Sequence, residues 1–186
     1  MNKPIDITGV VLETQRLVLR PWQEADLADF YEYARMDGVG QMAGWLPHKD
    51  MEESRQILAR FIAEKKTFAI VLDGKAIGSV GVEFYHEQEF PELATLQGRE
   101  IGYAMSRDYW GRGIMPEAVQ AVIGWLFACQ GLDFVLCAHF DWNRQSARVI
   151  EKCGFQYLKN TVSHPRTGTT ETTCNYILHN AHAAKN

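Results

Sequence analysis

Two glycines that flank an arginine, Gly111-Arg112-Gly113, stand between an apolar segment and a long stretch with helical periodicity. We expect a strand to end near Ser106, a tight turn to follow, and a helix to begin with Pro116 in its first turn, where a missing N–H group costs nothing. The first helical turn has unpaired N–H groups at the positive end of the helix dipole, and glycines let a bulky anion approach them. The segment therefore predicts a phosphate or diphosphate site, to which Arg112 adds a charge.

This motif has a simpler alternative, because an ordinary connection between a strand and a helix also tolerates two glycines. It is not a P-loop, since no Lys-Ser/Thr pair follows. It is not the dinucleotide fingerprint either, since it lies in the middle of the chain and lacks the third glycine. The neighbouring segments must decide between an anion site and a plain turn.

Several polar residues are candidates for acid–base or donor chemistry. Glu100 and Glu83 lie in or beside apolar segments with strand character, where an unpaired carboxylate is costly and its pKa is expected to rise. Each is a candidate general base, and His139 on a further strand is a weaker one, since such a residue is more often a core histidine. Asn143 is expected to cap a helix, and Ser146 falls in its first turn.

The elements that must hold these residues alternate between strands and helices. Asp73-Gly74 predicts a hairpin, and Asp50 with Glu53 predicts a capped helix. Strands are expected at residues 14–20, 68–72, 76–84, 99–106, 134–140, 155–160 and 171–178, and helices around 27–34, after 50, at 116–128 and at 143–153. The order predicts one α/β domain over residues 1–186, with its core at about 12–180, a tail at 181–186, and a mixed sheet with helices on both faces.

Composition narrows the classes of partner. The 186 residues are 46% hydrophobic and 23% charged, and the net charge of −4 argues against nucleic acid or an anionic membrane as the main partner. The longest apolar stretch, 121–129, is too short to span a bilayer, and the first residues lack the apolar core of a signal peptide. The spacing of the four cysteines matches neither a zinc site nor a redox pair. We expect a cytoplasmic protein with reduced core thiols and no metal site.

Three segments together resemble the GNAT N-acetyltransferases, in the branch of the ribosomal-protein alanine N-acetyltransferases. The glycine turn resembles the diphosphate loop of that family, Gln/Arg-x-x-Gly-x-Gly/Ala, with Trp110, Gly113 and Met115 at its three defined positions. Residues 14–34 (TQRLVLRPWQEADLADFYEYA) resemble its opening strand and helix. Residues 135–155 (VLCAHFDWNRQSARVIEKCGF) resemble its strand, Asn-x-x-Ser and final helix.

The resemblance implies a mostly antiparallel sheet of about seven strands with about four helices, splayed between its central strands. It also implies acetyl-coenzyme A (acetyl-CoA) as cosubstrate. Its binding residues would be Met105, Trp110, Gly111, Arg112, Gly113, Ile114, Met115, Asn143 and Ser146. Met115 departs from the small residue of the pattern, so its side chain must turn away from the diphosphate.

The resemblance assigns roles within that set. The main-chain N–H near Met105 would stabilise the oxyanion, and Asn143 would bind the pantetheine arm. Many members carry a general-acid tyrosine where this chain has Ile150, so Ser146 is expected to serve the departing sulfur instead. The family often uses a glutamate on the strand before the turn, which favours Glu100 as base, although ordered water is an alternative.

The expected activity is acetyl transfer to a primary amine by direct attack in a ternary complex. The acceptor is a protein N-terminal amine or a small-molecule amine, and a non-catalytic acetyl-CoA-binding module is the alternative from another class. The acceptor pocket is expected to use residues 37–49, 86–98 and 163–170. The chain is expected to be a monomer or a homodimer.

Overall fold

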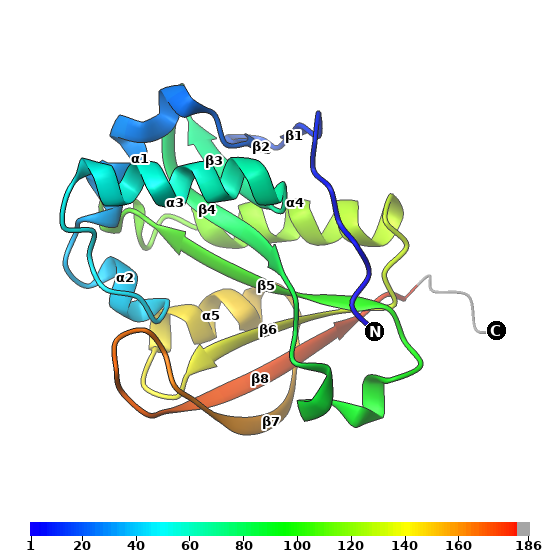
Figure 1. Ribbon diagram of the computed structural model, residues 1–186. Coiled ribbons are helices and arrows are strands. Elements are labelled where there is room, and N and C mark those ends of the chain that lie inside the picture. Colours follow the sequence, from blue (N-terminus) through cyan, green and yellow to red (C-terminus); the bar gives the residue numbers. More distant parts are fainter. Residues whose placement is uncertain (182–186) are drawn as a thin grey trace.

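The protein folds around one eight-stranded sheet in the order β1-β2-β3-β4-β5-β6-β8-β7, with helices on both faces (Figure 1). The computed structural model describes residues 1–181, so the predicted tail at 181–186 lies, except for Ala181, outside the described residues. The strands are β1 (Leu12–Glu13), β2 (Val18–Pro21), β3 (Thr67–Leu72), β4 (Lys75–Glu83), β5 (Gly98–Met105), β6 (Phe134–Phe140), β7 (Gln156–Ser163) and β8 (Glu171–His179). The helices are α1 (Leu27–Ala34), α2 (Val39–Met42), α3 (Met51–Glu64), α4 (Ile114–Ala128) and α5 (Arg144–Lys152).

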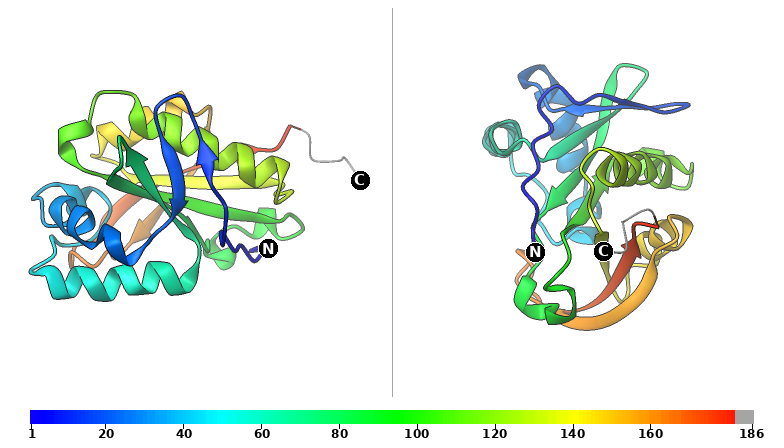
Figure 2. Two further views of the ribbon diagram at one scale, coloured as in Figure 1. Left: turned by 90° about the horizontal axis from the view of Figure 1, so that it is seen from above. Right: turned by 90° about the vertical axis from the view of Figure 1, so that its right-hand side faces the viewer.

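Each face of the sheet buries its own apolar core. Helices α1 and α3 cover one face, while α4 and α5 cover the other (Figure 2). On the α4 face, strand residues such as Phe68, Ile70 and Ile101 pack against Val122 and Leu126 of the helix. On the α1 and α3 face, the core contains Trp22, Phe30, Tyr33, Leu58 and Ala69. The alternation of apolar residues along the central strands thus serves two layers of helices.

The sheet opens between its two central strands. β5 and β6 are the only parallel pair of strands in the described part of the chain, and their pairing covers Gly98–Ile101 against Phe134–Cys137. β5 continues to Met105 and β6 to Phe140, but the two strands no longer pair with each other there, and they diverge in Figure 1. The prediction of a mostly antiparallel sheet, splayed at its centre, is confirmed.

The first strand differs from its prediction. The chain does not run extended over residues 14–20, because a turn closes at Thr14, whose N–H donates to the Leu17 carbonyl at 2.9 Å. A two-residue strand precedes this turn and pairs antiparallel with β2. Leu17 and Leu19 are nevertheless both buried, as their alternation predicted. The Thr14 hydroxyl, which accepts from the Leu17 N–H at 2.9 Å, favours the turn over the strand.

Helix boundaries follow the capping chemistry with small differences. Asp50 caps α3 by accepting from the Glu53 N–H at 2.8 Å, but the Glu53 carboxylate accepts from Lys49 rather than from Asp50. α4 begins at Ile114, so Pro116 is its third residue, still within the first turn. The expected loop at 37–49 contains the single turn of α2.

The expectation of core thiols is met only in part. All four cysteines are free, and Cys137 and Cys153 are buried, but Cys129 is exposed at the end of α4 and was wrongly expected in the core. Within residues 1–181, no helix is long and apolar enough to cross a membrane.

Candidate active site

The glycine turn has the geometry of an anion site. Gly111 and Gly113 both adopt positive φ, at 75° and 73°, and Gly113 is the N-cap of α4. Because L-residues with a side chain rarely adopt this backbone, the sequence needs glycine at both positions. A Cβ added at Gly111 would have nothing within 4 Å, so the space above the turn is open.

The main-chain N–H groups of this turn have no partners. No acceptor within residues 1–181 lies in hydrogen-bond geometry with the N–H groups of Gly111, Arg112, Gly113, Ile114 or Met115. An unpaired N–H group is costly away from water, and these five lie at the positive end of a 15-residue helix. The turn can therefore bind a diphosphate through its main chain.

Two residues that depart from the family pattern have clear positions. Met115 is 5% exposed and packs in the α4 core, so its side chain turns away from the turn, as its size required. The Trp110 indole N–H donates to the Met105 carbonyl at 2.9 Å. Tryptophan thus ties the start of the turn to the end of β5. Arg112 lies over the Tyr109 ring, with its guanidinium carbon 5.3 Å from the ring centre.

The end of β5 presents a main-chain donor to the opening. Ser106 donates its N–H to Ile77 at 2.8 Å, on the β4 side. Successive N–H groups of a strand point to opposite edges, so the N–H of Met105 points away from β4, where β6 has already diverged. The Met105 carbonyl on the same edge is occupied by Trp110. The Met105 N–H is therefore placed to meet a group inside the opening.

An ion pair from the start of the chain supports the turn. The Arg16 guanidinium binds the Glu117 carboxylate at 2.6 Å and donates to the Arg112 carbonyl at 3.0 Å. Glu117 is in the first turn of α4, where its charge would oppose an anionic ligand. Hydrogen bonds from Thr14 and Arg16 overcome the effect of burial and lower the Glu117 pKa. Arg16 thus neutralises the one acidic residue of this helix start.

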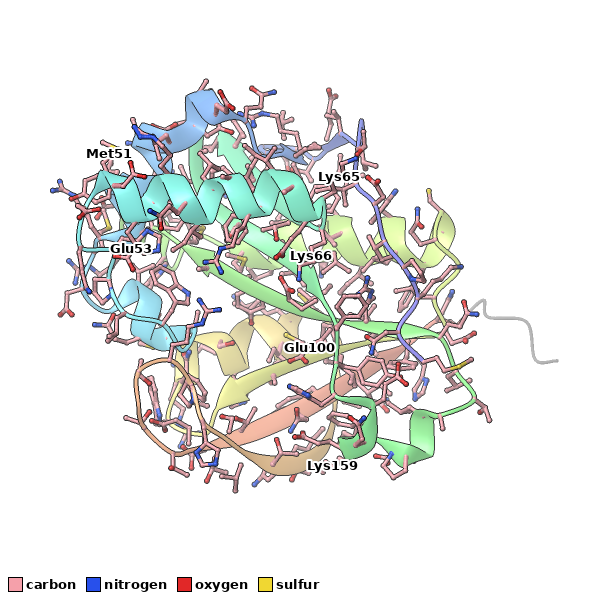
Figure 3. All side chains as sticks on the ribbon, in the orientation of Figure 1. Met51, Glu53, Lys65, Lys66, Glu100 and Lys159 are labelled. Carbon is pink, nitrogen blue, oxygen red and sulfur yellow. The ribbon has the colours of Figure 1, made fainter. Side chains whose placement is uncertain are left out.

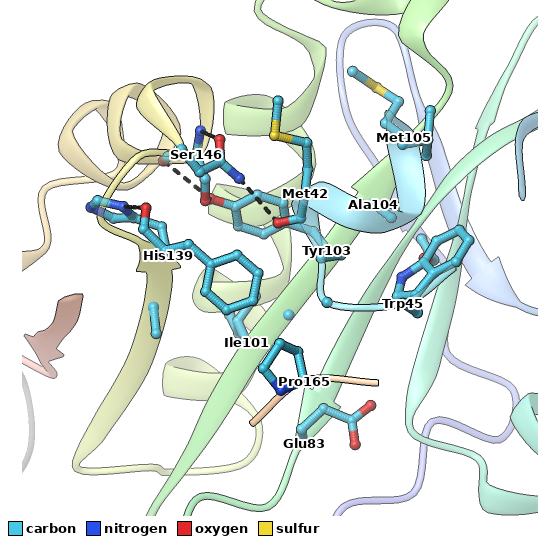
Figure 4. A pocket seen from close by; sticks show the side chains of 18 of the residues that line it. Met42, Trp45, Glu83, Ile101, Tyr103, Ala104, Met105, His139, Ser146 and Pro165 are labelled. Carbon is cyan, nitrogen blue, oxygen red and sulfur yellow. Dashed lines mark hydrogen bonds between the residues drawn. The ribbon is translucent and has the colours of Figure 1, made fainter. Parts of the chain in front are cut away.

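Across the opening, Asn143 caps the start of α5. Asn143 is 3% exposed, accepts from the Ser146 N–H at 3.1 Å and donates to the Met42 carbonyl at 3.0 Å. The predicted cap is confirmed, and it also fastens α2 to α5. The Ser146 hydroxyl lies 2.8 Å from the Tyr103 hydroxyl, which reaches it from β5 (Figure 4).

The two candidate carboxylates differ in their partners. Glu83 and Glu100 are opposite each other on β4 and β5. Glu83 forms an ion pair with Lys66 at 2.5 Å. Glu100, which lies near the centre of the molecule in Figure 3, has no hydrogen bond or ion pair within the described chain. Burial, followed by the charges of Glu83 and Glu89, raises the pKa of Glu100 to about 7.

His139 and Ile150 make contacts that stabilise the fold. His139 donates from Nδ1 to the Phe140 carbonyl at 2.7 Å, and its Nε2 lies 3.3 Å from the Tyr176 hydroxyl. Both ring nitrogens are engaged and the residue is 8% exposed, as expected for a core histidine. Ile150, which stands where many GNAT members have tyrosine, is 1% exposed and belongs to the α4 core.

One continuous cavity of about 1370 Å³ connects these groups. It extends from the glycine turn through the opening to the Glu83 and Glu100 side of the sheet. All three loop segments expected at the acceptor pocket contribute to its wall: residues 42–49, His86 with Glu89, and residues 163–166. The Arg166 N–H donates to the Gly44 carbonyl at 2.9 Å, so two of these loops touch. No group of three or more potential metal ligands occurs in residues 1–181.

Sequence reasoning did not find Tyr103 or Arg16. Tyr103 could have been found from its place two residues before Met105, because alternate strand residues share a face. The partnership of Arg16 with Glu117 joins positions 101 apart in the chain, and no local pattern signals it.

Comparison with known proteins identifies the family of the chain. The family model of the acetyltransferase (GNAT) domain matches residues 16–156, so the chain belongs to the GNAT acetyltransferase family and is an acyltransferase. It is 27% identical over 154 residues to YoaA of Bacillus subtilis, called an uncharacterized N-acetyltransferase, with 78% of this chain and 82% of that protein covered.

Solved structures share the fold. The ribosomal-protein-S5-alanine acetyltransferase of Vibrio fischeri superposes with a TM-score of 0.73 at 24% identity, covering 94% of this chain and 99% of that one. The microcin C7 self-immunity acetyltransferase MccE, solved in complex with acetyl-CoA and AMP, gives a TM-score of 0.74 at 15% identity, with 89% and 93% covered. The expected resemblance to GNAT enzymes, ribosomal-protein acetyltransferases among them, is confirmed.

Proposed function

We propose that this GNAT enzyme transfers the acetyl group of acetyl-CoA to a primary amine by direct attack in a ternary complex. The main support is the run of five unpaired N–H groups from Gly111 to Met115, which fits a diphosphate, at one end of a cavity that also contains an unpaired carboxylate. Acetyl-CoA supplies the reactive thioester, and the protein supplies its alignment with the amine.

The cosubstrate would lie along the opening between β5 and β6. The turn residues Gly111–Met115 would bind its diphosphate, and Asn143 would contact its pantetheine arm through the remaining amide hydrogen. The Met105 N–H would donate to the carbonyl oxygen of the thioester, where negative charge develops as the amine attacks. Its direction away from β4 supports that role.

Glu100 is the general base of this proposal. An amine must lose a proton during attack, and a base is most effective when its pKa lies near the working pH. The raised pKa of Glu100, about 7, meets that condition, and the carboxylate has no competing partner. Glu83 is a poorer candidate because Lys66 already holds its charge.

The acceptor is proposed to be an amine that enters from the three loop segments around Trp45, His86 and Pro165. A protein N-terminal amine and a small-molecule amine remain the two alternatives. In this proposal, coenzyme and acceptor would reach the opening from different ends of one cavity.

Thiol release from acetyl-CoA in the presence of peptides and small amines tests the function, with mass spectrometry identifying the acetylated product. We expect coenzyme A and an acetylated amine in equal amounts. Binding of acetyl-CoA without thiol release in any reaction would instead indicate the non-catalytic binding module.

A further inference from the structure

Tyr103 stands at the point where the two central strands part. The last pair between β5 and β6 joins Ile101 to Cys137, and Tyr103 follows two residues later, on the same face of β5 as Ile101 and Met105. Its side chain extends across the opening toward α5 (Figure 4). Tyr103 therefore lies between the main-chain donor at Met105 and the first turn of α5.

The tyrosine makes a specific contact there. Its hydroxyl oxygen is 2.8 Å from Ser146 Oγ and 3.3 Å from the Ser146 carbonyl oxygen. The carbonyl belongs to the hydrogen-bond ladder of α5, so the shorter contact to the hydroxyl is the stronger one. Burial is the main cause that raises the Tyr103 pKa well above its usual range, so the phenol keeps its proton at neutral pH.

The position in the next turn of α5 at which many GNAT members have tyrosine offers no donor here. Ile150 is buried in the core, and Asn143 at the helix start already donates to Met42 and accepts from Ser146. A serine hydroxyl has one hydrogen and can donate to one acceptor at a time. Whether Ser146 can donate into the opening therefore depends on what its neighbour Tyr103 does.

We propose that Tyr103 is a positioning residue that donates its hydrogen bond to Ser146 Oγ, so that the single Ser146 O–H points at the sulfur of acetyl-CoA. This inference rests on the proposed function. It adds a second hydroxyl, from β5, to the serine that the Asn-x-x-Ser segment supplies from α5.

The step balances without proton transfer from either hydroxyl. The amine nitrogen forms a bond to the acetyl carbon, the carbon–sulfur bond breaks, and its electron pair stays on sulfur. The proton of the amine goes to Glu100, and the Ser146 hydrogen bond stabilises the thiolate until solvent protonates it. A hydrogen bond from one hydroxyl strengthens the donor capacity of the next, so the pair acts as a unit.

The thiol of bound coenzyme A reports this arrangement without turnover. Its pKa is measured from the ultraviolet absorbance of the thiolate, with desulfo-coenzyme A as the blank. In the wild type, the donor pair should lower that pKa below the usual thiol value of about 8.5. Both Tyr103→Phe and Ser146→Ala should raise it, and the double variant should match Ser146→Ala alone.

Turnover gives a second readout on the same variants. We expect kcat to fall about tenfold in Ser146→Ala and several-fold in Tyr103→Phe, with little change in the Kd for acetyl-CoA. The double variant should be no slower than Ser146→Ala. Tyr157→Phe removes an exposed hydroxyl on β7 and is the matched control, with unchanged kcat.

A fluorinated tyrosine at position 103 keeps the ring and hydroxyl but is a stronger donor, so it should lower the bound thiol pKa further. Effects of Tyr103→Phe and Ser146→Ala that multiply, or a Tyr103→Phe protein with wild-type kcat and thiol pKa, would overturn the inference. An absence of amine acetylation by the wild type would refute the proposed function, whereas the thiol pKa series would still test the hydroxyl pair.

Discussion

The two ends of the cavity are built from different chemical groups. At the proposed coenzyme end, five main-chain N–H groups and a helix dipole form a site whose charge does not change with pH. At the proposed acceptor end, side chains from separate loops line the cavity together with Glu100, whose pKa is raised by burial to about 7. Changes at the first end should alter affinity for coenzyme, and changes at the second should alter turnover and pH dependence.

The largest effect is expected from Glu100→Gln. The variant loses the proposed base, so kcat should fall about 100-fold, while the Kd for acetyl-CoA should stay near that of the wild type. In the wild type, kcat should rise with pH through about 7, because the carboxylate must be deprotonated. Glu83→Gln should retain the rise but move it to lower pH, because the charge of Glu83 helps to raise the Glu100 pKa. A Glu100→Gln enzyme with the wild-type profile would transfer the role to water or another group.

The burial of Glu100 should also make the folding stability depend on pH. Its pKa is raised from 4.5 to about 7 on folding, so the folded state favours the neutral form. The folding stability contributed by this group is greatest below pH 4.5 and declines as pH rises toward 7. Thermal melting of Glu100→Gln should therefore exceed that of the wild type at pH 8 and approach it at pH 4. An identical difference at both pH values would show that Glu100 does not titrate as described.

Gly113→Asp and Gly113→Asn separate charge from shape at the coenzyme end. Both residues tolerate positive φ and both cap helices well, but only aspartate repels a diphosphate. We expect the Kd for coenzyme A to be at least about tenfold higher in the Asp variant than in the Asn variant. Gly74, which has φ of 82° in the hairpin, provides the control pair Gly74→Asp and Gly74→Asn, with no difference in Kd. Equal affinities of the two Gly113 variants would mean that the turn holds no anion.

Trp110→Phe tests the hydrogen bond that joins the glycine turn to the end of β5. It removes the indole hydrogen bond to the Met105 carbonyl, which orients the adjacent N–H group. We expect kcat to fall about threefold to tenfold and the melting temperature to fall slightly, as for one neutral hydrogen bond. Trp142→Phe, at an exposed site, is the control. Unchanged kcat in Trp110→Phe would show that Met105 needs no support.

The smallest effect is expected from Arg16→Gln, which leaves the Glu117 carboxylate uncompensated beside the turn. The Kd for coenzyme A should rise a few-fold at low salt, and the rise should shrink at high salt because exposed charges are screened. Glu117→Gln in the same chain should restore the affinity. A failure of that restoration would indicate that Arg16 contacts the coenzyme directly.

The coenzyme end was the more predictable of the two from sequence. Glycines with positive φ, a cap and a helix periodicity are local features, so the turn at Gly111 and the cap at Asn143 followed from neighbouring residues. The strand at 14–20 was mispredicted in its first half, because the Thr14 side chain stabilises a turn that the leucine alternation does not reveal.

The acceptor end depends on contacts between distant segments. The sequence showed that Glu83 and Glu100 were candidates, but only the register of β4 against β5 and the position of Lys66 separate the paired carboxylate from the unpaired one. Tyr103 and Ser146 likewise meet across an opening that no local pattern defines. Turns and helix caps can therefore be predicted from neighbouring residues, whereas the contacts between distant side chains can be identified only from the folded structure.

Backbone amide NMR during titration tests the proposed diphosphate site most directly. With coenzyme A, the amide signals of Gly111, Arg112, Gly113, Ile114 and Met115 should shift together at the concentration that saturates binding. Pantetheine, which lacks the diphosphate, should leave those signals in place. Saturable binding of coenzyme A with these five amides unperturbed would contradict the claim that the turn holds the diphosphate.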